Sequence, residues 1–288
     1  MNQHPKGCLY VVATPIGNSD DLSARAIRTM AEADLIACED TRRTGKMLAE
    51  IGVRTPTISY FEHNEDRRTP EIVAKLIAGA KVALVTDAGT PAISDPGFRL
   101  VRTALEAGVP VASVPGPSAA IAALSIAGLP TDRFTFEGFL PPRDSARRKM
   151  LESLRAEPRT MIFYEAARRL AATLDEMAEV FGPSRIAAVV REITKTYEET
   201  VRASLAELAN RYRATPALGE ITIVVEGAPD LAKSATDAPP VTIDALREVG
   251  LSLKQASAVI ALLTGRPRRE IYQEAVKLGA DDESSSDN

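Results

Sequence analysis

Five short segments of the chain combine glycine, proline and polar residues in patterns that suit ligand binding and proton transfer. In chain order they are residues 14–18 (TPIGN), 39–42 (EDTR), 61–65 (FEHNE), 87–97 (DAGTPAISDPG) and 115–119 (PGPSA). Glycine lets a backbone approach a bound molecule closely, while carboxylates and an imidazole can accept or donate protons. The chain has two histidines and two cysteines, without a CxxC pair, so these segments do not indicate a metal centre.

Each segment also has an ordinary structural explanation, because many of its residues are suited to helix N-termini or loops. The residues that suit the start of a helix are Asn18, Ser19, Glu39, Asp40, Asp95 and Ser118. His63 is a loop residue as readily as a catalyst. What distinguishes the five segments is their common position, since each directly follows a predicted strand.

The N-terminal part of the chain alternates short β-branched runs with amphipathic helical patterns. Strands are expected at residues 9–13, 35–38, 57–60, 82–86 and 109–114, and helices at residues 22–33, 42–51, 69–78, 98–107 and 119–126. Gly52, Gly79 and Gly108 follow three of these helices, as C-terminal caps do. This alternation predicts a parallel sheet whose strands all end at one edge, where the five segments would meet.

A second α/β domain is expected over residues 128–228, after a first domain over residues 1–127. Its strands are predicted at residues 134–139, 160–164, 186–190 and 220–225, and its helices at residues 146–156, 168–181 and 205–213. The spacing of these elements is less even than in the first domain, which favours a mixed sheet. The fold class is therefore α/β, with a mostly parallel sheet followed by a mixed one.

Three further regions follow the second domain. Residues 229–240 are polar and rich in proline, which indicates a linker. Residues 241–279 predict a small helical module with one helix starting near residue 251 and another near residue 267. A module of this size buries little core alone, so we expect it to dock or to bind. Residues 280–288 are acidic and are expected to form a disordered tail.

Composition limits the classes of function. The chain of 288 residues has a formal net charge of −4, and its last nine residues carry four carboxylates, so the remainder is neutral. A uniformly basic nucleic-acid-binding surface is therefore excluded, although local basic patches are not. No apolar run approaches the roughly 18 residues of a membrane span, and no apolar leader follows Met1, so we expect a cytoplasmic protein without membrane contact.

Three common catalytic motifs are missing from the chain. It has no GxxxxGK[ST] phosphate loop, no GxGxxG after the first predicted strand and no GxSxG nucleophile elbow. The sequence therefore contains no motif that supports ATP hydrolysis, nicotinamide chemistry or α/β-hydrolase chemistry.

The five segments together resemble the tetrapyrrole methylase superfamily, and in particular its ribosomal RNA branch. The segments that carry the resemblance are DAGTPAISDPG, EDTR, TPIGN and PGPSA, joined by residues 191–195 (REITK) and 219–222 (GEIT). They span residues 9–227 in order, without obvious gaps. The C-terminal module is similar to that of the same branch, more weakly.

The resemblance implies two α/β domains that hold S-adenosyl-L-methionine in the cleft between them. It also implies methyl transfer to the ribose 2′-hydroxyl of a cytidine in the decoding region of 16S rRNA, within the small ribosomal subunit, by a homodimer. Such a transfer depends on positioning and needs no covalent enzyme intermediate, which agrees with the missing nucleophile motif.

By the same resemblance, a set of residues is expected to bind the cofactor. They are Asp87, Gly89, Thr90, Ile93, Ser118, Ala119 and Tyr164. Gly89 would let the backbone approach the cofactor. Tyr164 would close over the adenine, although a place in the protein core suits it equally.

Catalysis at a ribose hydroxyl needs a group that accepts its proton. The candidates at the predicted edge are Glu39, Asp40, His63 and Glu65. We favour Glu39 as the base and Arg42 as the residue that holds a phosphate or neutralises the developing oxyanion. Alternatively, Glu39 holds its loop in place, and water takes the proton. The residues expected to contact the substrate are Asn18, His63, Glu65, Arg147 and Arg148.

Two other functions are compatible with the same residues. One is a methyltransferase that acts on a tetrapyrrole ring, which needs an apolar cleft and no basic patch. The other is a non-catalytic RNA-binding or assembly factor that keeps the fold. Cofactor binding separates the second from both enzymes, and the choice of acceptor separates the two enzymes.

Overall fold

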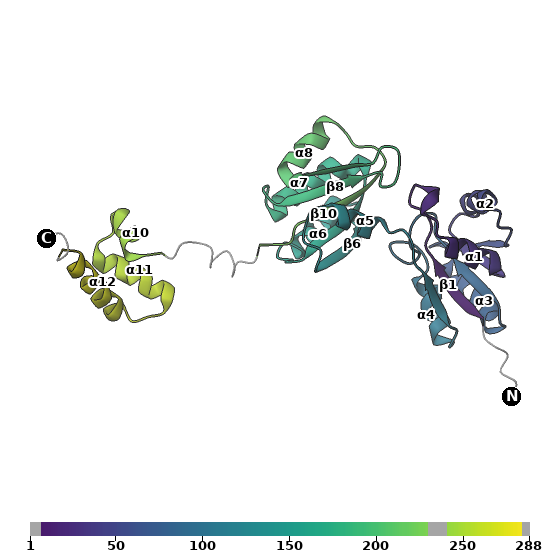
Figure 1. Cartoon of the computed structure of the whole chain (residues 1–288), viewed down its shortest axis with the longest axis horizontal. Coiled ribbons are helices and arrows are strands. Elements are labelled where there is room, and N and C mark those ends of the chain that lie inside the picture. The colour runs from purple at the N-terminus through teal and green to yellow at the C-terminus, as the bar shows by residue number, and fades with distance from the viewer. Residues whose placement is uncertain (1–6, 230–240, 284–288) are drawn as a thin grey trace. The chain divides into compact units, whose positions relative to one another are not determined.

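The structure of the chain, a computed structural model, describes residues 7–229 and 241–283 (Figure 1). It divides into two compact units, residues 1–228 and residues 229–288. The first unit contains two five-stranded sheets, and the C-terminal unit is helical. This arrangement confirms the predicted α/β class with a helical C-terminal part.

The first sheet is entirely parallel. Its strands are β1 (Cys8–Val12), β2 (Leu35–Cys38), β3 (Thr57–Ser59), β4 (Lys81–Leu84) and β5 (Val111–Val114). They lie in the order β3-β2-β4-β1-β5, so β4 is the central strand and every strand points the same way. The carboxyl ends of all five strands therefore meet at one edge, as predicted.

Four helices cover the two faces of this sheet. They are α1 (Ala24–Glu32), α2 (Thr41–Glu50), α3 (Glu65–Ile77) and α4 (Phe98–Glu106). Met30 of α1 and Leu48 of α2 pack in one buried cluster, while Leu76 of α3 and Leu100 of α4 pack in another. Each helix buries one apolar stripe, which is the periodicity that predicted it.

The second sheet is mixed. Its strands are β6 (Phe134–Phe139), β7 (Thr160–Ala166), β8 (Ile186–Arg191), β9 (Glu199–Ser204) and β10 (Glu220–Val225), in the order β6-β7-β10-β8-β9. β6 runs parallel to β7, and the other neighbours are antiparallel. Strand β9 was not predicted, because it is an edge strand of mostly polar residues. Its alternating exposure is the only strand signal in ETVRAS.

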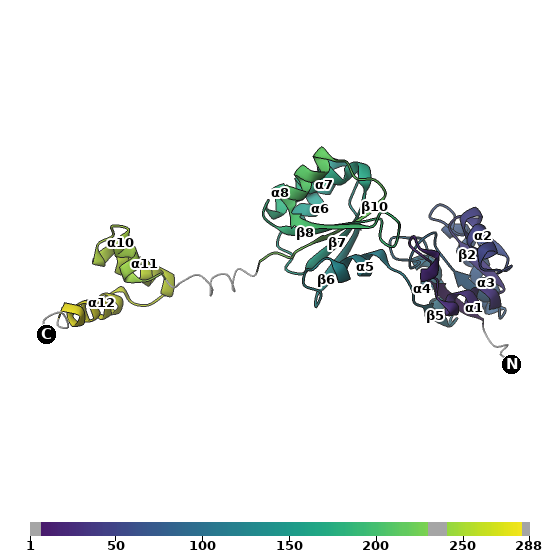
Figure 2. The same ribbon diagram turned by 45° about the horizontal axis from the view of Figure 1, so that its top comes forward.

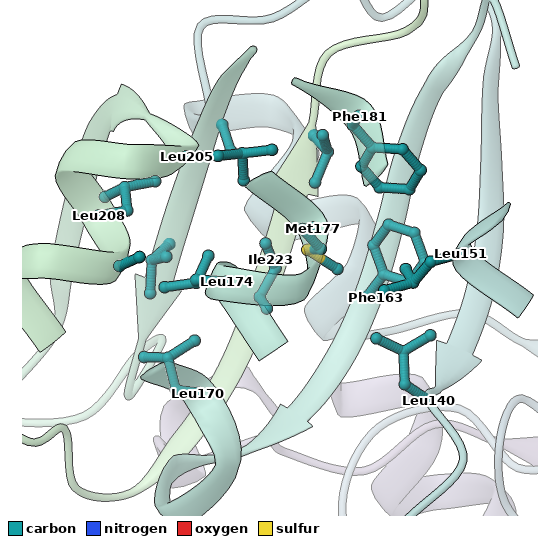
Figure 3. Close-up of a cluster of buried hydrophobic side chains, with 14 of the residues drawn as sticks. Leu140, Leu151, Phe163, Leu170, Leu174, Met177, Phe181, Leu205, Leu208 and Ile223 are labelled. Carbon is teal, nitrogen blue, oxygen red and sulfur yellow. The ribbon is translucent and has the colours of Figure 1, made fainter. Parts of the chain in front are cut away.

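The second sheet and the helices that pack on it are here called the second lobe. These helices lie on both faces of the sheet (Figure 2). One face carries α6 (Asp144–Ser153), α7 (Leu170–Phe181) and α8 (Leu205–Ala214), whose side chains form the largest buried cluster with those of β7, β8 and β10 (Figure 3). The other face is covered by α5 (Ala119–Ile126). Helix α5 thus packs on the second sheet, so the predicted boundary after residue 127 does not follow the packing.

The C-terminal unit consists of α10 (Ile243–Glu248), α11 (Leu253–Thr264) and α12 (Arg268–Glu283). Ser252 and Gln255 form a reciprocal capping box at the start of α11. Three helices replace the two that were predicted. Residues 280–283, expected to belong to a disordered tail, are helical instead, because α12 continues through Glu283. The predicted linker, from residue 230 on, and the tail beyond residue 283 lie outside the described residues.

Arg147 and Arg148 both lie within α6, in agreement with the helix predicted over residues 146–156. The side chain of Arg147 is only 5% exposed, and its guanidinium donates to Glu176 at 2.6 and 2.8 Å and to Asp144 at 3.0 Å. This burial is at odds with the prediction that Arg147 contacts the substrate. Arg148 is half exposed and pairs with Glu152 and Glu179.

The two neighbouring arginines should differ sharply when each is replaced by alanine. We expect Arg147→Ala to lower the free energy of unfolding by about 3 kcal/mol, since it leaves the largely buried Glu176 carboxylate without its partner. Arg148→Ala, the matched control, should cost less than about 1 kcal/mol, because its pairs are screened by solvent. Urea denaturation of the two variants and the parent measures both values. Equal losses would contradict the structural role of Arg147.

Candidate functional site

The loop after β4, residues 85–97, is the central feature of the site. It follows the middle strand of the first sheet, and each of the four other strand-end segments hydrogen-bonds to it. The five predicted segments are therefore in contact, as their position at one sheet edge indicated.

Two of these contacts are formed by the segments after β1 and β5. Thr14 and Gly89 exchange backbone hydrogen bonds of 2.9 and 3.1 Å, and the hydroxyl of Thr14 donates to the carbonyl of Thr86 at 3.0 Å. The Thr90 hydroxyl donates to the carbonyl of Pro117 at 3.1 Å. The position of Gly89 is thus fixed from both sides. Its φ of +87° is a conformation that favours glycine.

The segments after β2 and β3 hold the other side of the loop. Asp87 accepts hydrogen bonds from the backbone of Asp40 at 3.3 Å and from the guanidinium of Arg43 at 3.1 Å. The hydroxyl of Thr86 donates to Glu39 at 3.3 Å. The backbone of Gly97, just before α4, donates to Glu65 at 3.0 Å. Asp87 therefore acts here as an organiser of the loop.

A loop of the second lobe, residues 192–198, faces the same region. The backbone N–H of Asn18 donates to the Thr194 hydroxyl at 3.1 Å, which joins the TPIGN segment to the REITK segment. A Cβ on Gly17 would lie 2.4 Å from the side chain of Lys195, so only glycine permits this approach. Lys195 in turn donates to Glu192 at 2.9 Å and to Glu220 at 3.0 Å.

Backbone strain is concentrated in these two loops. Among the described residues, the four non-glycine residues with positive φ are Ala92, Ser94, Glu192 and Thr194. Left-handed conformations cost free energy for such residues and persist where the surroundings enforce them, which is common at functional sites. The strain therefore marks the loop after β4 and the loop after β8 as one functional region.

A pocket of about 300 Å³, here called the first pocket, lies between the loop after β4 and the end of the second sheet. Six of the seven predicted cofactor-binding residues line it: Gly89, Thr90, Ile93, Ser118, Ala119 and Tyr164. Asp87 does not line it. The apolar lining includes Phe139, Ile193 and Ile221, and carboxylate-bearing residues in the lining include Asp95 and Glu220.

Tyr164 both lines the first pocket and packs against other aromatic side chains. Its hydroxyl accepts a hydrogen bond of 3.2 Å from the backbone N–H of Ala120, in the first turn of α5. Its ring packs against Phe136 and Phe139, with ring centroids 5.0 and 5.4 Å away. The ring thus forms a fixed wall of the first pocket.

A larger pocket of about 940 Å³, here called the second pocket, lies beyond the ends of β2, β3 and β4. The predicted residues Glu39, His63 and Glu65 line it, together with Phe61 and Phe98. Ser94 and Asp95 line both pockets, so they stand between the two. Ser94 and Asp95 therefore form a wall that is common to the two pockets.

Asp95 is a site residue that the sequence analysis assigned only to a helix start. Burial and, to a smaller extent, repulsion from the nearby carboxylates of Glu39 and Asp87 together raise its pKa to about 6, against a hydrogen bond from Thr86 that lowers it. A carboxyl group with this pKa at the junction of two pockets can accept a proton near neutral pH. The signal available beforehand was its place in the longest strand-end segment.

Arg42, Asp40 and Asn18 contribute to the framework of the site. Asp40 begins α2 and accepts from the backbone of Arg42 at 2.8 Å, while the Arg42 guanidinium pairs with it at 2.9 Å. These hydrogen bonds lower the pKa of Asp40 to about 2. The Arg42 side chain is 90% exposed and lines neither pocket. Asn18 caps a short turn by accepting from Asp20.

Two other features are absent from the described residues. No group of histidine, cysteine or carboxylate side chains there is arranged to hold a metal ion. Within the same residues, no helix is long and apolar enough to cross a membrane.

Two family models match the chain. The model described as Tetrapyrrole (Corrin/Porphyrin) Methylases matches residues 8–209, and the model described as RsmI C-terminal HTH domain matches residues 235–279.

Similar proteins cover nearly the whole chain. A protein of Xylella fastidiosa named ribosomal RNA small subunit methyltransferase I is 47% identical over 272 residues, which are 92% of this chain and 98% of that protein. Proteins of the same name from Synechocystis and Escherichia coli O157:H7 are 45% and 42% identical, and each alignment covers 96% of this chain and 99% of the relative.

Solved structures share the fold at lower identity. A cobalt precorrin-4 methyltransferase is 17% identical with a TM-score of 0.56, over 76% of this chain and 94% of that one. Uroporphyrin-III C-methyl transferase from Thermus thermophilus, complexed with S-adenyl homocysteine, is 20% identical with a TM-score of 0.52, over 76% and 97% of the two chains. The matches to the family models and the relatives of high identity agree with the strand-end segments and the two sheets: the chain belongs to the tetrapyrrole methylase family.

Proposed function

We propose that this methyltransferase transfers a methyl group from S-adenosyl-L-methionine to the 2′-hydroxyl of a cytidine in the decoding region of 16S rRNA, in the small ribosomal subunit. The observation that carries the proposal is the pair of pockets that share Ser94 and Asp95. Donor and acceptor can occupy one pocket each and meet at these residues. The shared name of the relatives supports ribosomal RNA as the acceptor.

The residues of the first pocket fit S-adenosyl-L-methionine. Isoleucine and aromatic side chains offer a surface for the adenine, and the hydroxyls of Thr90 and Ser118 suit the polar groups of the ribose and the amino acid. The carboxylates of Asp95 and Glu220 suit a ligand that carries positive charge. The first turn of α5, behind Ser118, offers backbone N–H groups and a positive dipole end to a carboxylate.

The bound cofactor supplies a methyl group on a positively charged sulfur, which is an electrophile without further activation. The chain's own contribution is therefore position. Holding the acceptor oxygen roughly 3–3.5 Å from the methyl carbon can supply about 7–11 kcal/mol of the barrier. The hydrogen bonds that Thr14, Pro117 and Glu65 form with the loop after β4 keep its backbone in one geometry for this purpose.

Removal of the hydroxyl proton needs an acceptor, and two carboxylates are placed for it. Glu39 lines the second pocket, and Asp95 lines both. We assign proton acceptance to Asp95, with Glu39 raising its basicity through repulsion between the two carboxylates. Arg42, expected to stabilise the oxyanion, is instead paired with Asp40.

The deciding experiment is methyl transfer from labelled S-adenosyl-L-methionine to small ribosomal subunits from cells that lack this protein. Primer extension sensitive to 2′-O-methylation would map the product. A single new stop at a decoding-region cytidine is the expected result. Cofactor binding without transfer would favour a small-molecule acceptor such as a tetrapyrrole, and absence of cofactor binding would favour a non-catalytic RNA-binding factor. The homodimer and the cytoplasmic location stay predictions.

Gly89→Val should weaken cofactor binding. A Cβ at Gly89 lies 3.4 Å from Ile16 and 3.8 Å from the carbonyl of Pro117, so a branched side chain would enter the lining of the first pocket. We expect the Kd for S-adenosyl-L-methionine, measured by calorimetry, to rise at least about tenfold, or about 1.4 kcal/mol.

Gly52→Val is the matched control for this substitution. Gly52 also has a positive φ, but it follows α2 and has no heavy atom within 4 Å of a Cβ. The control bears the same kind of backbone strain and should bind the cofactor normally. A Gly89→Val variant with a Kd within twofold of the parent would refute the placement of the cofactor.

Asp95→Asn should increase stability at pH 7–8 and decrease activity. With a pKa of about 6, the folded chain retains a proton on Asp95 that the unfolded chain has already released. Ionised Asp95 therefore destabilises the fold above pH 6, and the variant should be more stable than the parent at pH 7–8. This gain should shrink as the pH falls from 6 to 4. Thermal melts at a series of pH values measure it.

The same substitution should lower the rate of methyl transfer about 10²–10⁴-fold, the usual contribution of a positioned base. In the parent, the rate should rise with pH through about 6, as Asp95 loses its proton. Glu50→Gln, at the exposed end of α2, is the control that should leave rate and stability unchanged. A normal rate in Asp95→Asn would transfer the role of base to Glu39 or to water.

Removal of residues 241–288 should leave cofactor binding within twofold of the full chain, because the first pocket lies entirely in the first unit. We expect turnover on small ribosomal subunits to fall at least about tenfold, since the removed helices carry Arg266, Arg268 and Arg269 as candidate phosphate contacts. Steady-state kinetics on subunits and calorimetry with the cofactor measure the two effects. Unchanged turnover would refute a role of the C-terminal unit in RNA binding.

A further inference from the structure

The second pocket has the position that an acceptor must occupy. It opens beyond the carboxyl ends of three parallel strands, where ligands bind in open α/β sheets. It adjoins the first pocket at Ser94 and Asp95. Its volume of about 940 Å³ exceeds that of the first pocket, so a group as large as a nucleotide can enter.

Two exposed aromatic rings line this pocket. Phe98, the first residue of α4, is 68% exposed, and Phe61, which follows β3, is 37% exposed. His63 lies edge-on to Phe61, with ring centroids 6.3 Å apart. Aromatic side chains presented to a cavity are the usual stacking partners of unpaired RNA bases.

The negative charge of the second pocket determines which part of a nucleotide can bind there. Five carboxylate residues line it, but only two arginines. Arg102 pairs with Glu106 at 2.8 Å, and Arg99 pairs with Asp66. An excess of carboxylates repels a phosphate, whereas it accepts hydrogen bonds from the exocyclic amine of a base.

We propose that the second pocket receives the unpaired base of the acceptor nucleotide, stacked on Phe61 and Phe98, with its exocyclic amine turned toward the carboxylates of Glu62 and Glu65. This inference rests on the proposed function and adds the way in which the acceptor is recognised. The ribose of that nucleotide then lies at Asp95, between the base and the first pocket. A paired base cannot enter, so the target nucleotide must leave its stack first.

Alanine substitutions of the two phenylalanines test the stacking. Phe98→Ala and Phe61→Ala should each lower kcat/KM for small ribosomal subunits about 5- to 150-fold, the range of base–aromatic stacking. The Kd for S-adenosyl-L-methionine should stay within twofold, since neither ring lines the first pocket. Losses below threefold in both variants would overturn the proposal.

Two further variants separate stacking from general packing. Phe98→Trp should restore activity to within threefold of the parent, whereas Phe98→Leu, which keeps an apolar side chain, should not. Leu105→Ala is the matched control, because Leu105 is a 57% exposed apolar residue of the same helix that does not line the pocket. Equal activity of Phe98→Leu and Phe98→Trp would overturn stacking as the mode of recognition.

A change in the acceptor tests the role of the amine. Uracil in place of the target cytosine removes the amine but keeps the ring, and kcat/KM of the parent protein should fall at least about threefold. An equal rate would overturn the assignment of the carboxylates. The parent protein also separates this proposal from the proposed function. If it methylates no site on native subunits, the function itself fails, and the phenylalanine variants are informative only when the parent is active.

Discussion

The site depends on one constraint of a parallel sheet. The loop that follows the central strand lies between the loops that follow the other strands. β4 lies between β2 and β1, and the loop that follows it is hydrogen-bonded to the segments after β1, β2, β3 and β5. A loop at an edge strand would have neighbours on one side only. Here, the central position makes one strained backbone the common wall of two pockets.

The second lobe forms the other side of the first pocket, and its REITK loop is hydrogen-bonded to the segment after β1. The REITK loop carries its own positive-φ residues and meets the TPIGN segment at the hydrogen bond between Asn18 and Thr194. Gly17 permits this contact, since any side chain there would collide with Lys195. Each strained loop is held by hydrogen bonds to neighbouring segments: the loop after β4 to Thr14 and Glu65, and the REITK loop to Asn18 and Glu220.

Much of this arrangement could be predicted from the sequence, because its main signals are local. The apolar periodicity that buries Leu48 and Leu100 also marks the helices, and glycines such as Gly52 mark their ends. Parallel strands then bring the strand ends together without further information. Strand β9 was missed because an edge strand with one exposed face carries little apolar signal.

Site chemistry was harder to predict, because charge depends on neighbours that are distant in the sequence. Arg147 has the residue type and the neighbours of an RNA contact, yet Glu176, 29 residues away, holds it in the core of its lobe. Asp95 is the opposite case, since its place before Pro96 suggests a simple helix start. Its elevated pKa arises from burial, from Glu39, which the end of β2 contributes, and from Asp87 of the same loop.

The chemistry of methyl transfer explains why some site residues fix the backbone while others contact the acceptor. A reaction that needs no protein nucleophile places its demands on geometry, so the critical residues are those that fix a backbone: Gly89, Gly17 and the hydroxyls that hold the loop after β4. Side chains that touch the acceptor then decide which molecule reacts. The first pocket and the second pocket can therefore change independently within one fold, because they share only Ser94 and Asp95. Conservation of the first pocket with variation of the second would let one family act on tetrapyrrole rings and on RNA.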